Sequence, residues 1–150
     1  MKMNIEFRGK DARYYICDLS EGLSLKGLPW GKREFNVFIL SFDKTIADSK
    51  KVGILIDSLV RRKTDWFDVL GIRAEKLHDK IDRSGVRLGR QKKVGDGSPM
   101  TGWFEETTKV KDMAEHIWAS CGDNIIIVIL GSQNDFNRFV KAMKNILDKE

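Results

Sequence analysis

Cysteine is scarce in this chain, and no apolar run approaches the roughly 18 residues that a membrane span needs. The two cysteines, Cys17 and Cys121, are not spaced as metal ligands, and both lie beside apolar residues. We therefore expect reduced, partly buried thiols and a cytoplasmic protein that does not contact membranes. The N-terminal segment lacks the apolar stretch of a signal peptide and is predicted to form a strand instead.

The familiar motifs of nucleotide binding and serine hydrolysis are also missing. Neither GxGxxG nor GxxxxGK[ST] occurs, which argues against the usual phosphate-binding loops. A GxSxG nucleophile elbow is absent as well. No internal repeat or low-complexity tract is visible, and no cofactor is predicted.

The composition is that of a well-solvated globular domain. The chain has 150 residues, of which 41% are hydrophobic and 33% are charged. This length predicts a single domain with a core of its own. The net charge of +5 comes from 27 basic and 22 acidic residues, and such a mild excess gives only weak support for an anionic partner.

The most informative segment is the aliphatic run from Ile125 to Leu130. Alternate side chains of a strand point to opposite faces, so an unbroken apolar run predicts a strand covered on both faces, as in parallel sheets. Gly131 ends the run. Ser132, followed three positions later by Asp135, predicts a capping box at the start of the last helix.

Apolar spacing predicts the remaining elements. Helical spacing of apolar residues recurs in several segments, and short β-prone runs separate them. The predicted strands cover residues 3–7, 12–17, 35–40, 66–70, 100–104 and 124–130. The predicted helices cover about 45–62, 74–83, 110–118 and 136–147.

Strands that alternate with helices indicate an α/β fold. We predict one three-layer domain with a mostly parallel sheet of three to four core strands and helices on both faces. Residues 1–33 form an N-terminal β ribbon and a connection, and residues 34–150 form the βα core. In such sheets ligands bind at the carboxyl ends of the strands, here residues 41–43, 71–73 and 131–132.

The densest polar cluster lies on the helix predicted after the fourth strand. Glu75, His78, Asp79 and Asp82 fall on one helical face, since residues three and four apart are neighbours. An imidazole beside carboxylates would bind a divalent metal or act as a general base oriented by an acid. The alternative is a solvated helix face without chemistry. The other histidine, His116, is interpreted as structural.

A second candidate is the segment around Trp103. Paired aromatic residues are followed by Glu105 and Glu106, and tryptophan is favoured at binding hot spots. We therefore predict a partner-binding surface there. The alternative is that Trp103 covers the edge of the sheet while Thr107 or Thr108 caps the next helix.

A third candidate is a basic loop predicted at residues 84–99. Arg87, Arg90, Lys92 and Lys93 place four cations on a glycine-jointed segment, which would grip phosphates. No aromatic residues interleave with them to stack on bases, so a solvated loop is the favoured interpretation.

Residues Gly71–Ile81 with His78, Asp79 and Asp82, and the later Met100-Thr101-Gly102-Trp103, resemble a family of uncharacterised bacterial small α/β domains. The resemblance extends over residues 35–131. Proteins of this kind often occur as immunity or accessory proteins in bacterial conflict systems. The resemblance implies an α/β fold and a bacterial origin, and it marks His78, Asp79, Asp82 and Trp103 as positions of interest.

The favoured function is a non-enzymatic domain that binds a protein partner, such as a toxin that an immunity or antitoxin protein neutralises. Its predicted partner-binding residues are Trp103, Glu105, Glu106 and Trp30.

Two other functions stay open at this point. The first is a small hydrolase, either metal-dependent or working by acid–base catalysis, that uses His78 with Asp79 or Asp82 and draws Asp43 from the neighbouring strand end. The second is a nucleic-acid contact through residues 87–93.

Overall fold

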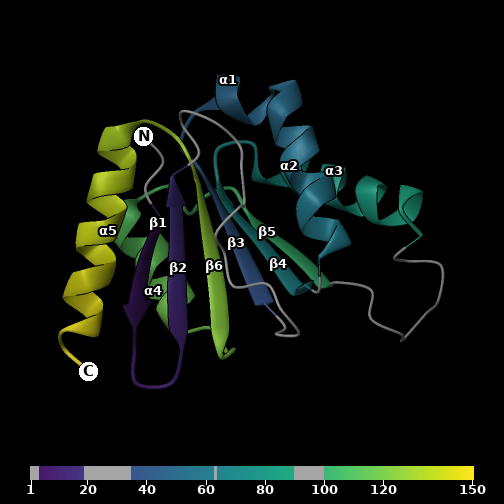
Figure 1. Cartoon of the computed structure of the whole chain (residues 1–150). Helices are drawn as coiled ribbons and strands as arrows, with labels where there is room; N and C mark the ends of the chain where they lie inside the picture. The colour runs from purple at the N-terminus through teal and green to yellow at the C-terminus, as the bar shows by residue number, and fades with distance from the viewer. Residues whose placement is uncertain (1–3, 19–34, 63, 90–99) are drawn as a thin grey trace.

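A computed structural model describes residues 4–18, 35–62, 64–89 and 100–150 (Figure 1). The connection predicted before the third strand lies outside the described residues. The strands are β1 (Asn4–Arg8), β2 (Arg13–Asp18), β3 (Phe35–Ser41), β4 (Thr64–Gly71), β5 (Met100–Phe104) and β6 (Asn124–Leu130). The helices are α1 (Lys44–Ala47), α2 (Lys50–Arg61), α3 (Ala74–Arg87), α4 (Val110–Trp118) and α5 (Gln133–Leu147).

The described strands form one mixed sheet in the order β1-β2-β6-β3-β4-β5. β1 and β2 form an antiparallel hairpin, and every other neighbouring pair is parallel. The aliphatic run of β6 pairs with β2 on one side and β3 on the other, and its residues from Ile125 onward are buried. The prediction of a strand covered on both faces is therefore confirmed.

The predicted number of strands is wrong, because the sheet has six rather than three to four. The N-terminal ribbon forms as predicted, but it joins the main sheet through β2. Arg13 pairs with Asn124, and the parallel register continues to Asp18 and Ile129. Side chains of β2 from Tyr14 onward are buried, so this strand belongs to the core of the sheet.

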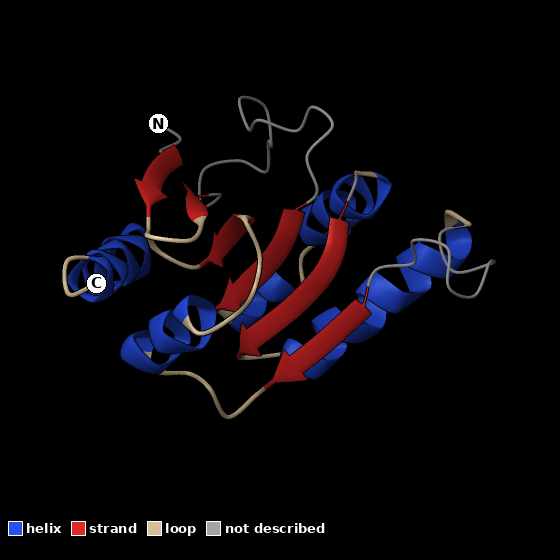
Figure 2. Ribbon diagram, turned by 90° about the horizontal axis from the view of Figure 1, so that it is seen from below, coloured by secondary structure: helices blue, strands red, loops and turns tan. Residues whose placement is uncertain are grey.

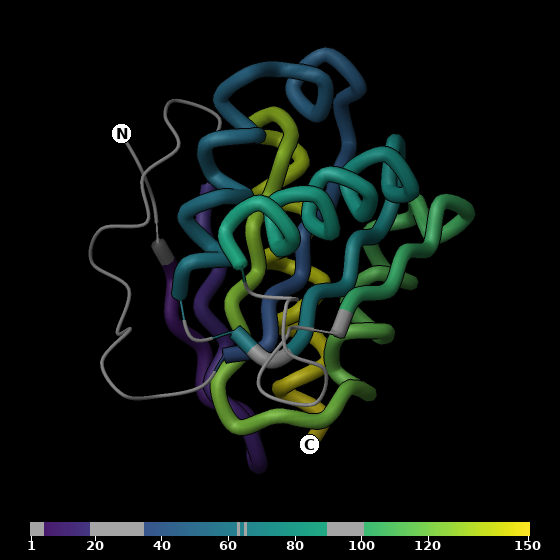
Figure 3. The backbone as a smooth tube through the Cα atoms, turned by 90° about the vertical axis from the view of Figure 1, so that its right-hand side faces the viewer, coloured from purple at the N-terminus to yellow at the C-terminus, as the bar shows by residue number. Residues whose placement is uncertain are grey.

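Helices cover both faces of the sheet, as Figures 2 and 3 show from two directions. Ile126, Val128 and Leu130 of β6 belong to the core cluster that also contains buried residues of α2 and α3. The alternate residues Ile125, Ile127 and Ile129 belong to the cluster that contains buried residues of α4 and α5. The three predicted layers are therefore present.

Two helix boundaries differ from the prediction. The helix predicted over residues 45–62 is divided into α1 and α2, because the Ser49 amide and hydroxyl both bond to the Ile46 carbonyl and close a turn there. The helix predicted to end near residue 83 continues to Arg87. Its last turn contacts α2, where Asp57 accepts a 2.6 Å hydrogen bond from the Ser84 hydroxyl and pairs with Arg87.

The predicted capping box at the start of α5 is confirmed. The Ser132 side chain accepts from the Asp135 amide, and the Asp135 carboxylate accepts from the Ser132 amide. None of the helices in the described part of the chain is long and apolar enough to cross a membrane.

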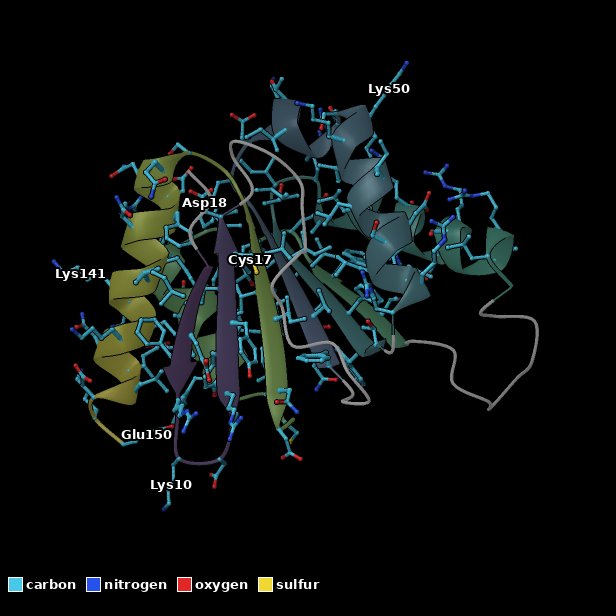
Figure 4. All side chains as sticks on the ribbon, viewed as in Figure 1. Lys10, Cys17, Asp18, Lys50, Lys141 and Glu150 are labelled. Atoms are coloured by element: carbon cyan, nitrogen blue, oxygen red, sulfur yellow. The ribbon has the colours of Figure 1, made fainter. Side chains whose placement is uncertain are left out.

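Glu150 links the β1–β2 turn to α4. One carboxylate oxygen accepts a 2.7 Å hydrogen bond from the Lys10 amide, and the other accepts a 2.8 Å bond from the Trp118 indole. Lys10 and Glu150 lie close together below the hairpin in Figure 4. This carboxylate also lies near the buried ring of Tyr14, whose pKa is raised mainly by burial and further by Glu150 and Asp11.

The raised pKa of Tyr14 predicts a loss of stability in alkali. The folded state keeps a phenolic proton that the unfolded chain releases near pH 10, so this contribution is complete below about pH 10 and is lost as the pH rises through the folded-state pKa. We expect the unfolding free energy of the wild type to fall more steeply above this pH than that of Tyr14→Phe, in urea titrations at several pH values. Burial lowers the pKa of Lys80, so this group raises the unfolding free energy as the pH increases. Its contribution is the same in the wild type and in Tyr14→Phe. Parallel curves would contradict the prediction.

Candidate functional site

The edge strand β5 presents one set of side chains to each helical layer. Its register with β4 pairs Thr101 with Phe67 and Gly102 with Asp68. Thr101 and Trp103 face α3, where both contact His78. Gly102 and Phe104 face the α4 side of the sheet. Beyond β5 no further strand is described, so its outer edge is open within the described part of the chain.

On the α3 side, His78 is held between β5 and its own helix. Its Nε2 lies 2.8 Å from the Thr101 hydroxyl, which is also 3.1 Å from a carboxylate oxygen of Asp82 and donates to it. Its Nδ1 lies 3.5 Å from Asp79 and 3.6 Å from Asp82. The predicted neighbours His78, Asp79 and Asp82 are thus brought together, and Thr101 joins them.

This arrangement favours a structural link over a catalytic base. Both ring nitrogens of His78 face protein groups, and its side chain is only 16% exposed. Among the described residues, no three His, Cys, Asp or Glu side chains are grouped to hold a metal ion.

The structure does not bring Asp43 to His78. The Asp43 carboxylate is the N-cap of α1, where it accepts bonds of 2.8 Å from the Thr45 amide and 3.2 Å from the Ile46 amide. In the described part of the chain, the hydrogen bonds and ion pairs of His78 come from α3 and β5 instead. The predicted hydrolase site therefore lacks Asp43, the residue that was expected from the neighbouring strand end.

The aromatic pair at the end of β5 is exposed. Trp103 is 43% exposed and Phe104 is 37% exposed, and both Glu105 and Glu106 point to solvent. The Trp103 ring contacts the His78 ring edge-on, with centroids 6.2 Å apart. The predicted caps Thr107 and Thr108 are wrong, since α4 begins after Lys109, whose side chain makes no capping bond.

Two of the helices that follow the carboxyl ends of strands, α1 and α5, are capped by side chains, whereas α3 and α4 have no side-chain cap. Asp43 caps α1, and the Ser132–Asp135 box caps α5. Near the start of α3, Asp48 pairs with Lys76 at 3.0 Å and Arg73 at 3.6 Å. The hydrogen bond from Lys76, aided by the nearby positive charges, holds the pKa of Asp48 below its usual value. We place the candidate site at β5, where Thr101 and Trp103 contact His78 and where Trp103 is exposed.

The predicted basic loop is only partly described. Arg87 belongs to the last turn of α3, where it pairs with Asp57. Arg90, Lys92 and Lys93 lie outside the described residues, as does Trp30.

Asp68 is a residue that sequence reasoning missed. It lies in the middle of β4 and is only 7% exposed. Its two carboxylate oxygens contact the Trp66 indole nitrogen at 2.7 Å and His116 Nε2 at 3.3 Å. An acidic residue between the apolar residues Phe67 and Val69 was the available signal, because a buried charge needs partners. His116, interpreted as structural, is one of them.

No protein-family model matches this chain, and no curated protein matches it either. The resemblance of residues 35–131 to bacterial α/β domains therefore stays a prediction.

Proposed function

We propose that this protein is a non-enzymatic binding domain that captures a basic, extended segment of a protein partner along β5. The observation that carries the proposal is a strand at the edge of the described sheet, with an exposed aromatic pair, Trp103 and Phe104. The free amides and carbonyls of an edge strand pair readily with another chain. Strand addition of this kind gains affinity from main-chain hydrogen bonds and specificity from side-chain contacts.

The charge beside β5 supports a basic partner. Glu105 and Glu106 follow the strand directly, and Asp79 and Asp82 lie on the helix that packs against it. These acidic groups stand out on a chain whose net charge is +5. Complementary charge speeds association and disfavours the wrong partners.

Trp103 is well placed to act as an anchor. Its ring rests against His78, which Thr101 and the carboxylate of Asp82 hold in turn. A side chain that is already oriented loses less conformational entropy when a partner binds. This support favours Trp103 as the centre of the contact.

These features favour an immunity or antitoxin protein of the cytoplasm that neutralises a toxin. A toxin that acts on nucleic acid needs a basic surface to contact phosphates. An edge strand with acidic residues beside it that covers such a surface would block access to the nucleic acid. The two cysteines are not joined in a disulfide, which suits the cytoplasm.

The test compares capture of a partner by matched tryptophan variants. The wild type, immobilised and exposed to a lysate of its source organism, should retain one stoichiometric protein whose affinity is then measured after purification. Trp103→Ala should weaken binding by about 30-fold, the loss typical of a hot-spot residue. Trp118→Ala removes a similarly exposed tryptophan from α4 and should change the affinity less than about twofold.

Hydrogen exchange then locates the contact. The β5 amides of the wild type should become protected in the complex, and protection elsewhere would contradict the proposed edge. Recovery of no stoichiometric partner, or equal binding by Trp103→Ala, would overturn the proposal. A toxin partner should also lose its toxicity when it is co-expressed with the wild type but not with Trp103→Ala.

A further inference from the structure

A cavity of about 600 Å³ lies on the face of the sheet opposite the His78 cluster. Its sheet side is formed by the amino halves of β3 and β4, including Phe38, Trp66 and Asp68. Its helix side is formed by His116 and the turn from Ala119 to Cys121, at the carboxyl end of α4. Its size falls within the range typical of small-molecule sites, about 300–1,000 Å³.

Within the described part of the chain, no lysine or arginine pairs with the Asp68 carboxylate at this cavity. Its ion-pair partner there is His116, and an aspartate can only accept, so His116 Nε2 donates. His116 and the Trp66 indole supply one hydrogen bond each. A mostly buried carboxylate without a lysine or arginine partner is stabilised by a cation that pairs with it.

The surroundings preserve access to this carboxylate. Gly102 of β5 lies beside it, and a Cβ on that glycine would lie 2.6 Å from Asp68 Oδ1. The Phe38 and Phe104 rings contact the His116 ring edge-on and hold it in place. The carboxylate is therefore fixed in position while the cavity beside it stays open.

The rest of the cavity also favours positive charge. The last turn of α4 ends at its border, and the carboxyl end of a helix carries a partial negative charge. Trp66, at the opposite wall, is partly exposed, and an indole face attracts cations. Phe38 and Ala119 supply apolar surface for an uncharged part of the ligand.

We propose that this cavity binds a small organic cation, an ammonium group carried on an apolar ring. The ammonium pairs with Asp68, and the ring packs against Trp66 and Phe38. This site is separate from the Trp103 contact of the proposed function, because Trp103 contacts His78 on the opposite face of the sheet.

The test uses three probes with the same ring and different charge: benzylammonium, benzyl alcohol and benzoate. The indole N–H signal of Trp66, identified in ¹⁵N-labelled protein by its absence in Trp66→Phe, reports binding. Benzylammonium should shift this signal saturably. Benzyl alcohol and benzoate should bind at least about tenfold more weakly, since they lack the charge that pairs with Asp68.

Two variants define the site. Asp68→Asn keeps the shape of the side chain but removes its charge, and should weaken the binding of benzylammonium by about tenfold. Asp112→Asn removes a charge from the exposed first turn of α4 and should leave binding unchanged. If Asp68→Asn does not fold, Ala119→Phe decides instead, because it fills the cavity from an exposed position and should abolish the shift.

Cys121 gives a second measurement that needs no ligand affinity. It is the exposed cysteine, whereas Cys17 is buried. Its thiolate attacks a methanethiosulfonate to form a mixed disulfide and release methanesulfinate. The cationic aminoethyl reagent should react faster with Cys121 than the anionic sulfonatoethyl reagent. The ratio of the two rate constants should fall severalfold in Asp68→Asn and stay unchanged in Asp112→Asn.

Three results would overturn the proposal. The first is that no probe shifts the Trp66 indole signal at concentrations up to about 50 mM, which would be weak binding even for a molecule of this size. The second is binding of benzoate or benzyl alcohol that equals that of benzylammonium. The third is benzylammonium binding, or a reagent ratio, that folded Asp68→Asn leaves unchanged.

Discussion

Replacing Ile127 with alanine is expected to lower the free energy of unfolding by about 3 kcal/mol. Ile127 lies in the middle of β6, between Ile16 of β2 and Phe38 of β3, and it is 0% exposed. Its loss removes apolar contacts and leaves a cavity that the two neighbouring strands cannot close. Urea denaturation followed by circular dichroism measures the change.

Ile54→Ala is the matched control for this substitution. Ile54 lies on α2 and is 66% exposed, so the same change in chemistry removes few contacts. We expect its unfolding free energy to stay within about 0.5 kcal/mol of the wild type. Similar losses at both positions would show that β6 is not the central strand described above.

Gly71→Ala is expected to cost about 3 kcal/mol through the backbone rather than the core. Gly71 ends β4 with φ at +101°, a conformation that residues with a Cβ rarely adopt. A Cβ there would lie 2.3 Å from the Ser41 carbonyl oxygen, which accepts the Ile72 amide. Because the obstacle is main chain, the ends of β3 and β4 must move apart.

A second glycine supplies the control with the opposite sign. Gly53 lies within α2, and no atom would lie within 4 Å of an added Cβ. Gly53→Ala should therefore raise the unfolding free energy by about 0.5–1 kcal/mol, because alanine has the higher helix propensity. The same urea titrations measure both variants. A loss of stability in Gly53→Ala, or none in Gly71→Ala, would contradict this account.

Local pattern predicted most individual elements. The run of β6 and the Ser132–Asp135 box depend on residues close in sequence, so their signals are complete within a short window. The division between α1 and α2 escaped notice because the apolar spacing from Val52 onward belongs to α2 alone. The break depends on hydrogen bonds from the Ser49 amide and hydroxyl to the Ile46 carbonyl, and apolar periodicity carries no signal for such bonds.

Strand partners were harder to predict than strands. The register of β2 with β6 joins opposite ends of the chain, and an apolar strand carries no local mark of its neighbour. The same limit applies to the candidate sites. Helical spacing predicted that His78 and Asp82 are neighbours, but their contact with Thr101 is tertiary. The contact between Asp68 and His116 joins two elements and has no signature in either.

The position of β6 between β2 and β3 also determines the order in which the protein is completed during synthesis. Among the described strands, β1 and β2 leave the ribosome earliest, whereas β6, which pairs with β2, leaves last. A two-stranded hairpin alone is marginally stable in water. While β3, β4 and β5 assemble, the edge of β3 that later pairs with β6 therefore has no partner. The β1–β2 hairpin likewise has no strand to join it to the sheet. Insertion of β6 pairs it with β2 and β3 at the same time. Until then the unpaired strand edges are exposed, and chaperones that bind exposed strands would bind the chain.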